Sequence, residues 1–284
     1  MTTSQKKNIL LIGGTGFIGR NIVEQLSSKH DISAPSLEEL NLLDESAVER
    51  FFKSQKFDVV IHAANMGEYK ASEEPNGISV KNIRMFFSLV RQLKPHQKMI
   101  FLGSGAEYDK RRDIASIKED EFDKCIPIDN YGFAKYVCSK YIEKTNNIVN
   151  LRCFGVYGKY EQHTRFISSA IINALNNKPI VIRKNTYFDY LYVDDLVKII
   201  DFFISNKNKH KFYNAASRIS IDLITLSSLV KKIIGHKEEI IVEESGMGKE
   251  YTANTSRLSQ ETNIQLTSLE EGIGKLTEYY RNQH

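Results

Sequence analysis

Three side chains of the sequence have the types and spacing needed to reduce a carbonyl group: Ser104, Tyr131 and Lys135. A phenol can give a proton to a carbonyl oxygen while a hydride arrives at the carbon, and a serine hydroxyl can hydrogen-bond the same oxygen. A free phenol has a pKa of about 10, which suits neutral pH poorly, but a nearby ammonium group stabilises phenolate. We therefore expect a catalytic trio. The alternative for Tyr131 and Lys135 is an ordinary solvated pair on a helix.

The elements around these residues must bring them together. "YGFAK" begins a predicted helix over 131–145, where a spacing of four puts Tyr131 and Lys135 on one face. Ser104 ends "KMIFLGS", one of several short apolar runs that alternate with helical patterns. This alternation predicts an α/β fold, a doubly wound parallel sheet with helices on both faces. The other predicted strands are 8–13, 30–34, "FDVVIHAA", "IVNLRCF" and "FYNAA", and the other helices of this half are 16–28, 45–55 and 79–93.

A glycine-rich turn follows the first predicted strand and opens a helix. In "GGTGFIG", Gly13 allows a tight turn, Gly16 lets the backbone approach a pyrophosphate, and Gly19 lets the helix pack closely on the strand. The helix N-terminus then faces the phosphates, with Phe17 and Ile18 contributing through their backbone. The strand–turn–helix context predicts a dinucleotide site at the carboxyl edge of the sheet, where Ser104 also lies.

The rest of the cofactor site is predicted from strand ends. The tip of the second strand carries Ser36 in the place where an acid often holds the ribose of NAD, so we favour NADPH, with NADH as the alternative. Asp44 either reaches the adenine or caps the next helix. Ala63 and Ala64 end the third strand and are small enough to let the ribose pass. The neighbouring His62 is interpreted as structural.

Composition limits the partners and the compartment. The chain has 284 residues and a formal net charge of +4 with both signs interspersed, which falls short of a nucleic-acid-binding surface. Three cysteines without metal spacing (Cys125, Cys138 and Cys153) predict reduced thiols in the cytoplasm and no metal site. No apolar run is long enough for a membrane span.

Eight segments together resemble the extended short-chain dehydrogenases/reductases, the NAD-dependent epimerase/dehydratase family that acts on nucleotide sugars. They are "GGTGFIG", "DVVIHAA", "FLGSGAEYD", "YGFAK", "LRCFGVYG", "YLYVDDL", "FYNAAS" and "TSLEEGI". The resemblance implies a Rossmann domain over 1–156 and about 187–215. It also implies a smaller, discontinuous nucleotide-sugar lobe over about 157–186 and 216–284, and a homodimer formed through the helices that carry the Tyr–Lys pair.

Departures from the family pattern narrow the reaction. Sugar-nucleotide dehydratases carry Asp-Glu after the strand-end hydroxyl, whereas this chain has Gly105-Ala106, with Glu107 one place later. Dehydration is therefore disfavoured. The segment "LEELNLLDESAVERFF" resembles GDP-fucose synthases and dTDP-4-dehydrorhamnose reductases. The former epimerise with a cysteine where this chain has Ala106, and a methyl group cannot move protons.

The surviving hypothesis is NADPH-dependent reduction of the C4 ketone of a nucleotide-linked 4-keto-6-deoxy sugar. An NAD-dependent C4-epimerase would use the same Ser104, Tyr131 and Lys135, and it remains the alternative. A cofactor-sensing regulator without turnover is a third hypothesis, which the presence of the tyrosine and the lysine disfavours.

The substrate side is less defined by sequence. Met66, Gly67 and Glu68 follow the third strand, where the family often contacts substrate, and Asn82 is a candidate for ordering a water or the backbone near the site. Phe188 stands where many relatives have an arginine that contacts the nucleotide phosphates; it stacks on a base or packs in the lobe. The substitute cations by proximity are Arg165, Arg183 and Lys184, and Tyr157 is a candidate nicotinamide neighbour.

Overall fold

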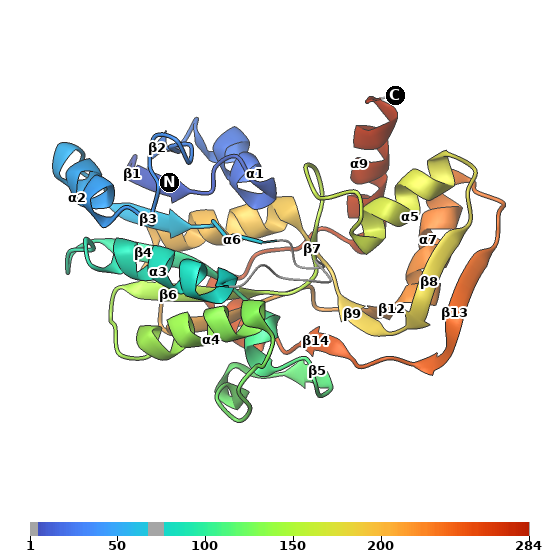
Figure 1. Ribbon diagram of the computed structural model, residues 1–284. Coiled ribbons are helices and arrows are strands. Elements are labelled where there is room, and N and C mark those ends of the chain that lie inside the picture. The colour runs from blue at the N-terminus through green and yellow to red at the C-terminus, as the bar shows by residue number, and fades with distance from the viewer. Residues whose placement is uncertain (1–4, 68–76, 284) are drawn as a thin grey trace.

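The larger part of the protein is built on one parallel sheet. A computed structural model describes residues 5–67 and 77–283. Six strands in the order β11-β6-β4-β3-β1-β2 form this sheet (Figure 1), and every neighbouring pair is parallel. The predicted doubly wound parallel sheet is thus confirmed. Its strands are β1 (Asn8–Ile12), β2 (Asp31–Ser33), β3 (Val59–His62), β4 (Lys98–Ser104), β6 (Ile148–Cys153) and β11 (Phe212–Ala215).

Helices cover both faces of the sheet because its central strands are apolar on both sides. In β1, Ile9 and Leu11 point into one hydrophobic cluster, while Leu10 and Ile12 point into the other. This continuous apolar run is the pattern of a strand buried on both faces. The first cluster is closed by α1 (Phe17–Leu26) and α6 (Val193–Ser205). The second is closed by α2 (Glu45–Ser54), α3 (Ile78–Val90) and α4 (Asn130–Ile142).

A smaller lobe lies beside the carboxyl edge of this sheet (Figure 1). It contains a four-stranded sheet in the order β12-β9-β14-β5 and a two-stranded parallel ribbon, β13-β8. Its strands are β5 (Ile114–Ile117), β8 (Ile180–Asn185), β9 (Tyr187–Asp189), β12 (Ser220–Asp222), β13 (Ile240–Met247) and β14 (Tyr251–Ala253), and its helices are α5 (Phe166–Leu175), α7 (Leu223–Ile234) and α9 (Leu269–Arg281).

Some segments join the two parts. Strand β5 comes from the connection between β4 and α4, yet it pairs with β14 in the smaller sheet. The short pair β7 (Val156–Tyr157) and β10 (Leu191–Tyr192) is parallel. Helix α8 (Ser256–Thr262) returns late in the chain, and its Leu258 packs into the core of the larger sheet. The domain boundaries given above remain a prediction.

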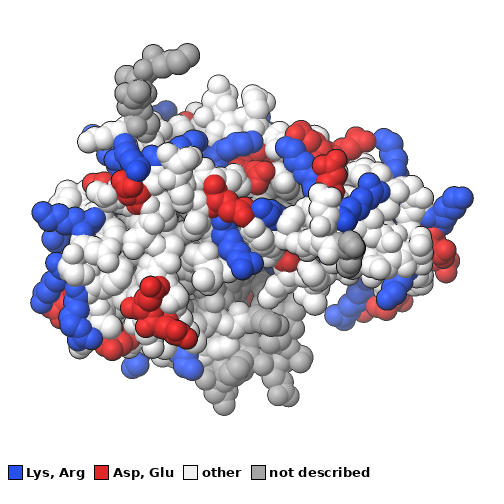
Figure 2. Space-filling view, turned by 90° about the horizontal axis from the view of Figure 1, so that it is seen from above, with Lys and Arg blue, Asp and Glu red and all other residues white. Residues whose placement is uncertain are grey.

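The surface carries both charge signs. Figure 2 shows lysines and arginines interspersed with aspartates and glutamates over the face in view, as the near-neutral composition predicts. None of the helices in residues 5–67 and 77–283 is both long enough and apolar enough to cross a membrane.

The close contact at Gly155 joins the large sheet to the smaller lobe, and a substitution there tests its importance for stability. A Cβ at Gly155 would lie 2.1 Å from the carbonyl oxygen of Asp189 in β9. We expect Gly155→Ala to lower the free energy of unfolding by about 1–3 kcal/mol, because backbone must move to admit the methyl group.

A matched control is Gly274→Ala in α9, where nothing lies within 4 Å of the added Cβ. That variant should gain about 0.5–1 kcal/mol from the better helix propensity of alanine. Urea unfolding measures both, and equal stabilities for the two variants would contradict the contact at Gly155.

Candidate active site

The glycine turn after β1 has the shape expected of a dinucleotide cradle. Gly13 has φ +90°, in the left-handed region that favours glycine, and a Cβ there would lie 2.7 Å from the Ala64 nitrogen. A Cβ on Gly19 would lie 2.0 Å from the Gly13 carbonyl oxygen, so this glycine permits the close helix–strand packing. Gly16 caps α1 and has no side chain to occupy the N–H groups of the first turn. The turn and the helix N-terminus therefore fit a pyrophosphate.

The three candidate catalytic residues come from two elements that meet at the carboxyl edge. Lys135 donates from Nζ to the carbonyl oxygen of Leu102 in β4, at 2.7 Å. Its Nζ also lies 5.9 Å from the centroid of the Tyr131 ring, one helical turn away. Ser104 ends β4, and its Oγ accepts a hydrogen bond from the Ala106 N–H at 3.1 Å. That bond leaves the serine hydroxyl proton available for another acceptor.

Helix α4 begins where it does because Asp129 caps it, accepting from the Gly132 N–H at 2.9 Å. The first turn presses against the segment after Ser104, since a Cβ on Gly132 would lie 2.8 Å from the Ala106 carbonyl oxygen. Ala106 is fully buried in this contact. The predicted helix and its Tyr–Lys spacing are thus positioned against the end of β4.

Burial governs the electrostatics of Lys135. The side chain is 7% exposed, and this desolvation lowers the pKa of its ammonium from the ordinary 10.5, while the charge of Glu107 opposes the shift. Desolvation and then the Lys135 charge lower the pKa of His62 to about 3. His62 is therefore neutral at pH 7 and packs against Phe86 and Phe101, as a structural histidine would.

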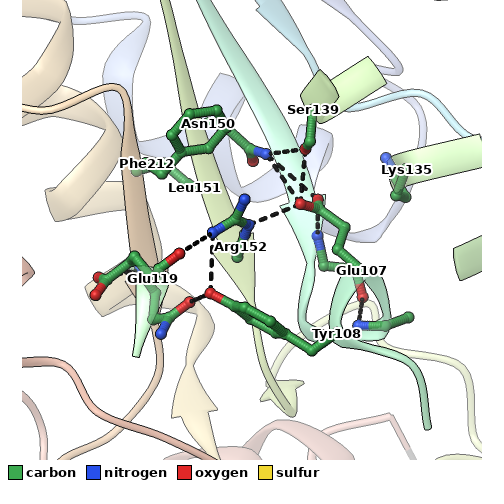
Figure 3. Close-up of polar contacts among 12 residues, drawn as sticks. Glu107, Tyr108, Glu119, Lys135, Ser139, Asn150, Leu151, Arg152 and Phe212 are labelled. Atoms are coloured by element: carbon green, nitrogen blue, oxygen red, sulfur yellow. Dashed lines mark hydrogen bonds and ion pairs between the residues drawn. The ribbon is translucent and has the colours of Figure 1, made fainter. Parts of the chain in front are cut away.

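Glu107 cannot act as a substrate base. It is 0% exposed, and its Oε2 accepts from Arg152 Nε at 2.7 Å (Figure 3). A fully buried, ion-paired carboxylate does not face a sugar. This geometry agrees with the argument against dehydration.

Two residues predicted to contact the cofactor have local roles. Asp44 caps α2, accepting from the Ala47 N–H at 3.0 Å, which is the second of the two roles considered for it. Ser36 accepts weakly from the Glu39 N–H at 3.3 Å, and the Glu39 carboxylate accepts from the Ser36 N–H at 2.7 Å. Sequence reasoning missed Glu39, although Ser-x-x-Glu is the signature of this reciprocal pair. A carboxylate therefore lies at the tip of the second strand after all.

On the substrate side, the backbone after β3 is fixed by Asn82. Its Oδ1 accepts from the Met66 N–H at 2.8 Å and its Nδ2 donates to the Met66 carbonyl at 3.1 Å. Gly67 follows with φ +87°. Glu68 lies outside the described residues.

Aromatic side chains cluster near the segment after Ser104. Phe188 packs against Tyr190 and Tyr251, with ring centroids 5.9 and 6.0 Å apart. Its stacking on a base remains a prediction. Tyr251 was missed by sequence reasoning. A Cβ on Gly105 would lie 2.6 Å from its hydroxyl oxygen, so only the pairing of β14 with β5 and β9 brings it to this edge.

The remaining candidates on this side are engaged elsewhere. Arg165 pairs with Glu161, and Arg183 pairs with Glu244 at 2.8 Å. Lys184 lies 4.0 Å from Glu244. Tyr157 is 1% exposed and packs on Tyr192 in the core of the smaller lobe. The structure therefore places Tyr131 and Lys135 on a helix that packs against the end of β4, where Ser104 lies, and these other side chains take part in packing and ion pairs.

Comparison with known proteins decides the family. A model of the NAD dependent epimerase/dehydratase family matches residues 9–216. The chain belongs to this family. Its members include enzymes that modify nucleotide sugars with nicotinamide cofactors, and a nicotinamide cofactor suits the glycine cradle described above.

Three relatives match this chain over nearly its whole length and nearly their own. It is 25% identical to GDP-L-colitose synthase of Yersinia pseudotuberculosis, over 97% of the chain and 98% of that relative. It superposes on UDP-glucose 4-epimerase of Thermotoga maritima, solved with UDP-glucose, with a TM-score of 0.84 at 24% identity, covering 97% and 99% of the two chains. It also superposes on GDP-mannoheptose C4 reductase of Campylobacter jejuni, solved with NADP, with a TM-score of 0.83 at 19% identity, covering 99% of each chain.

The glycines of the cradle allow a test that separates folding from cofactor binding. A Cβ on Gly16 meets only the Gly13 carbonyl oxygen, at an ordinary contact distance of 3.4 Å, whereas one on Gly19 meets the same atom at 2.0 Å. We expect Gly16→Ala to keep the wild-type melting temperature and to weaken NAD(P)H binding by about tenfold or more, because its methyl group lies where a pyrophosphate approaches.

In contrast, Gly19→Ala should lower the melting temperature, because the helix can no longer pack on the strand. Thermal melts and fluorescence titration with NADH and NADPH measure the two effects. Unchanged cofactor affinity in Gly16→Ala would contradict the cradle.

Proposed function

We propose that the protein reduces the C4 ketone of a nucleotide-linked 4-keto-6-deoxy sugar with NADPH. The observation that carries this proposal is the buried Lys135 ammonium beside the Tyr131 ring, on a helix packed against the segment that follows Ser104. Bound at the glycine cradle, the cofactor would supply the hydride. Tyr131 would give the proton to the carbonyl oxygen, Lys135 would favour the phenolate that results, and the Ser104 hydroxyl would hold the oxygen.

The choice of reduction rests on two observations. Glu107 is buried and ion-paired, so the acid–base pair of a dehydratase is missing from the segment 104–107. Ala106 is buried against α4 and offers only a methyl group where a GDP-fucose synthase has its cysteine. The Campylobacter relative named as a C4 reductase with NADP supports the same assignment.

A C4-epimerase with NAD is the second candidate, and one specific observation favours it. The Glu39 carboxylate folds back on Ser36 at the tip of β2, where negative charge would repel the 2′-phosphate of NADP and suit the ribose hydroxyls of NAD. The Thermotoga relative named as a UDP-glucose 4-epimerase supports this alternative.

The experiment that separates the candidates follows absorbance of NADPH and of NADH with 4-keto-6-deoxy and 4-hydroxy nucleotide sugars. A reductase consumes one cofactor per sugar reduced. An epimerase interconverts 4-hydroxy sugars without net consumption. A sensor binds the cofactor and does neither, which would reject the proposed function.

Replacing the candidate proton donor gives the next prediction. Tyr131→Phe should lower kcat by about 10²–10⁴-fold, because no proton donor remains at the carbonyl oxygen, while NADPH affinity stays within a few-fold. The matched control is Tyr141→Phe, which removes a phenolic hydroxyl from the 37% exposed residue of the same helix and should leave kcat unchanged. Full activity in Tyr131→Phe would remove the assigned role.

We also propose a homodimer formed through α3 and α4, in the cytoplasm, where the three free thiols suit a reducing environment. The two helices pack side by side (Figure 1) and expose Val80 at 54% and Phe133 at 40%. Apolar side chains on adjacent exposed helix faces are typical of a contact surface.

This dimer makes a prediction in solution. Light scattering after gel filtration should give twice the 32.6 kDa of one chain for the wild type. Phe133→Asp should give a monomer, because the charge would be buried unpaired at the interface. Ile224→Asp, which changes a 38% exposed residue of α7, should remain dimeric. A monomeric wild type would reject the dimer.

A further inference from the structure

A buried carboxylate joins the candidate catalytic serine to the helix that carries the candidate tyrosine and lysine. Glu107 lies in the short helix η1 (Gly105–Tyr108), three residues after Ser104. Its Oε1 accepts from the Ser104 N–H at 3.0 Å. Its Oε2 accepts from the Ser139 hydroxyl of α4 at 2.6 Å (Figure 3). One side chain thus holds two elements of the site.

Ser139 is placed to transmit this link to the active site. It is four residues after Lys135 and eight after Tyr131, so the three side chains lie along one face of α4. Anchoring Ser139 fixes that face relative to the end of β4. The backbone contact between Gly132 and Ala106 joins the same two elements at the start of the helix. Two contacts, one at Gly132 and one at Ser139, therefore fix the position of the Tyr–Lys pair relative to the serine hydroxyl.

The carboxylate is itself held rigidly from β6. Arg152 donates from Nε to Glu107 at 2.7 Å, and both side chains are 0% exposed. The guanidinium carbon lies 4.3 Å from the Phe122 ring centroid and 4.6 Å from that of Phe212, so the arginine has little freedom to turn. Asn150 Nδ2 approaches both carboxylate oxygens at 3.3 Å. A charged acceptor with these partners offers Ser104 a fixed hydrogen bond.

The charge of Glu107 also reaches Lys135. Burial lowers the pKa of Lys135, and the negative charge of Glu107 opposes this shift, as do the Cys138 and Cys153 thiols to the extent that they ionise. Burial raises the pKa of each thiol to about 12, so both are neutral near pH 7. His62 is neutral at this pH because burial lowers its pKa to about 3. Of these neighbours of Lys135 in the described part of the chain, Glu107, which forms an ion pair with Arg152, is thus the one that carries charge.

We propose that Glu107 is a positioning residue for the proposed carbonyl reduction. It accepts from the Ser104 amide and the Ser139 hydroxyl, and so sets the serine hydroxyl relative to Tyr131 and Lys135. Being buried, it touches neither substrate nor cofactor. The inference rests on the proposed function, because it names what sets the geometry of that reaction.

Two variants of the whole enzyme test it. Glu107→Gln keeps the shape and removes the charge, whereas Ser139→Ala removes the link to α4 and leaves the Glu107–Arg152 pair intact. In both we expect kcat to fall by about 10–100-fold, because the reacting groups are displaced. KM and the NADPH dissociation constant should stay within about threefold of the wild type. The Ser104 amide should exchange its hydrogen faster in Glu107→Gln.

The pH profile separates charge from geometry. The Lys135 pKa lies below 10.5 in the protein, so activity that needs the ammonium is lost as pH rises through that lowered value. Glu107→Gln removes a charge that raises this pKa, so the alkaline limb of kcat should move to lower pH. Glu107→Asp keeps the charge on a side chain too short to reach both partners. It should lower kcat without moving that limb.

The matched control is Glu119→Gln. Glu119 is 6% exposed and belongs to the same buried polar region, where its carboxylate accepts from the Asn214 N–H at 2.9 Å rather than from Ser104. We expect a lower melting temperature with wild-type kcat and an unmoved alkaline limb.

The results that overturn the inference are defined by these comparisons. Wild-type kcat in Ser139→Ala overturns it, and that variant decides alone if Glu107→Gln fails to fold. A loss of kcat in Glu119→Gln equal to that in Glu107→Gln also overturns it, since general destabilisation then accounts for both. If the wild type turns over no nucleotide sugar, the proposed function fails. The exchange rate of the Ser104 amide in Glu107→Gln then decides whether Glu107 holds Ser104, and a wild-type rate overturns the inference.

Discussion

The burial of the Lys135 ammonium is the interaction on which the rest of the site depends. Removing an ammonium group from water costs several kcal/mol unless hydrogen bonds and charges compensate for it. The compensation comes from the Leu102 carbonyl, from the faces of the Phe101 and Tyr131 rings, and from the charge of Glu107. A lysine held in this way stabilises negative charge on a neighbouring phenol more strongly than a solvated lysine would, because little water screens it.

The sheet supplies the second requirement, which is close approach between segments distant in sequence. Parallel strands end at one edge, so the glycine turn after β1, the alanines after β3 and the serine of β4 all lie there. Several glycines at this edge stand where backbones or side chains come too near for a Cβ. Gly103 shows this best, since a Cβ there would lie 2.1 Å from the Asn150 side chain and 2.4 Å from that of Glu107. The buried cluster of Glu107, Asn150 and Arg152 therefore requires a residue without a Cβ at position 103 of β4.

Much of this arrangement is predictable from sequence because it depends on local patterns. The strands of the large sheet other than β2 are four to seven residues long and mostly apolar, and the spacing of Tyr131 and Lys135 follows from helix geometry alone. The smaller lobe is less predictable. Strand β13 is mostly exposed and β14 has three residues, so neither has a strong apolar pattern, and β5 joins a sheet formed from residues far along the chain. Pairings of this kind depend on tertiary contacts rather than on propensity.

The same reasoning explains which site residues the sequence reveals. A glycine motif and a tyrosine–lysine spacing can be recognised in the sequence because their residues are close together in it. The hydrogen bond between Glu107 and Arg152 joins residues 45 apart, and no local pattern indicates it. Glu39 is an intermediate case, because Ser-x-x-Glu is a local signal and its consequence for cofactor choice appears only when it folds back on Ser36.

In the proposed function, hydride passes between a nicotinamide and C4 of a nucleotide-linked sugar at the sheet edge that carries Ser104, Tyr131 and Lys135. The most direct measurement is a single turnover with stereospecifically deuterated [4-²H]NADPH and a 4-keto-6-deoxy nucleotide sugar, with mass and NMR analysis of the product. The account predicts that the deuterium from one face of the cofactor appears at C4 of the sugar. The account is contradicted if the product carries deuterium at another carbon. It is also contradicted if the product receives deuterium from neither face of the cofactor.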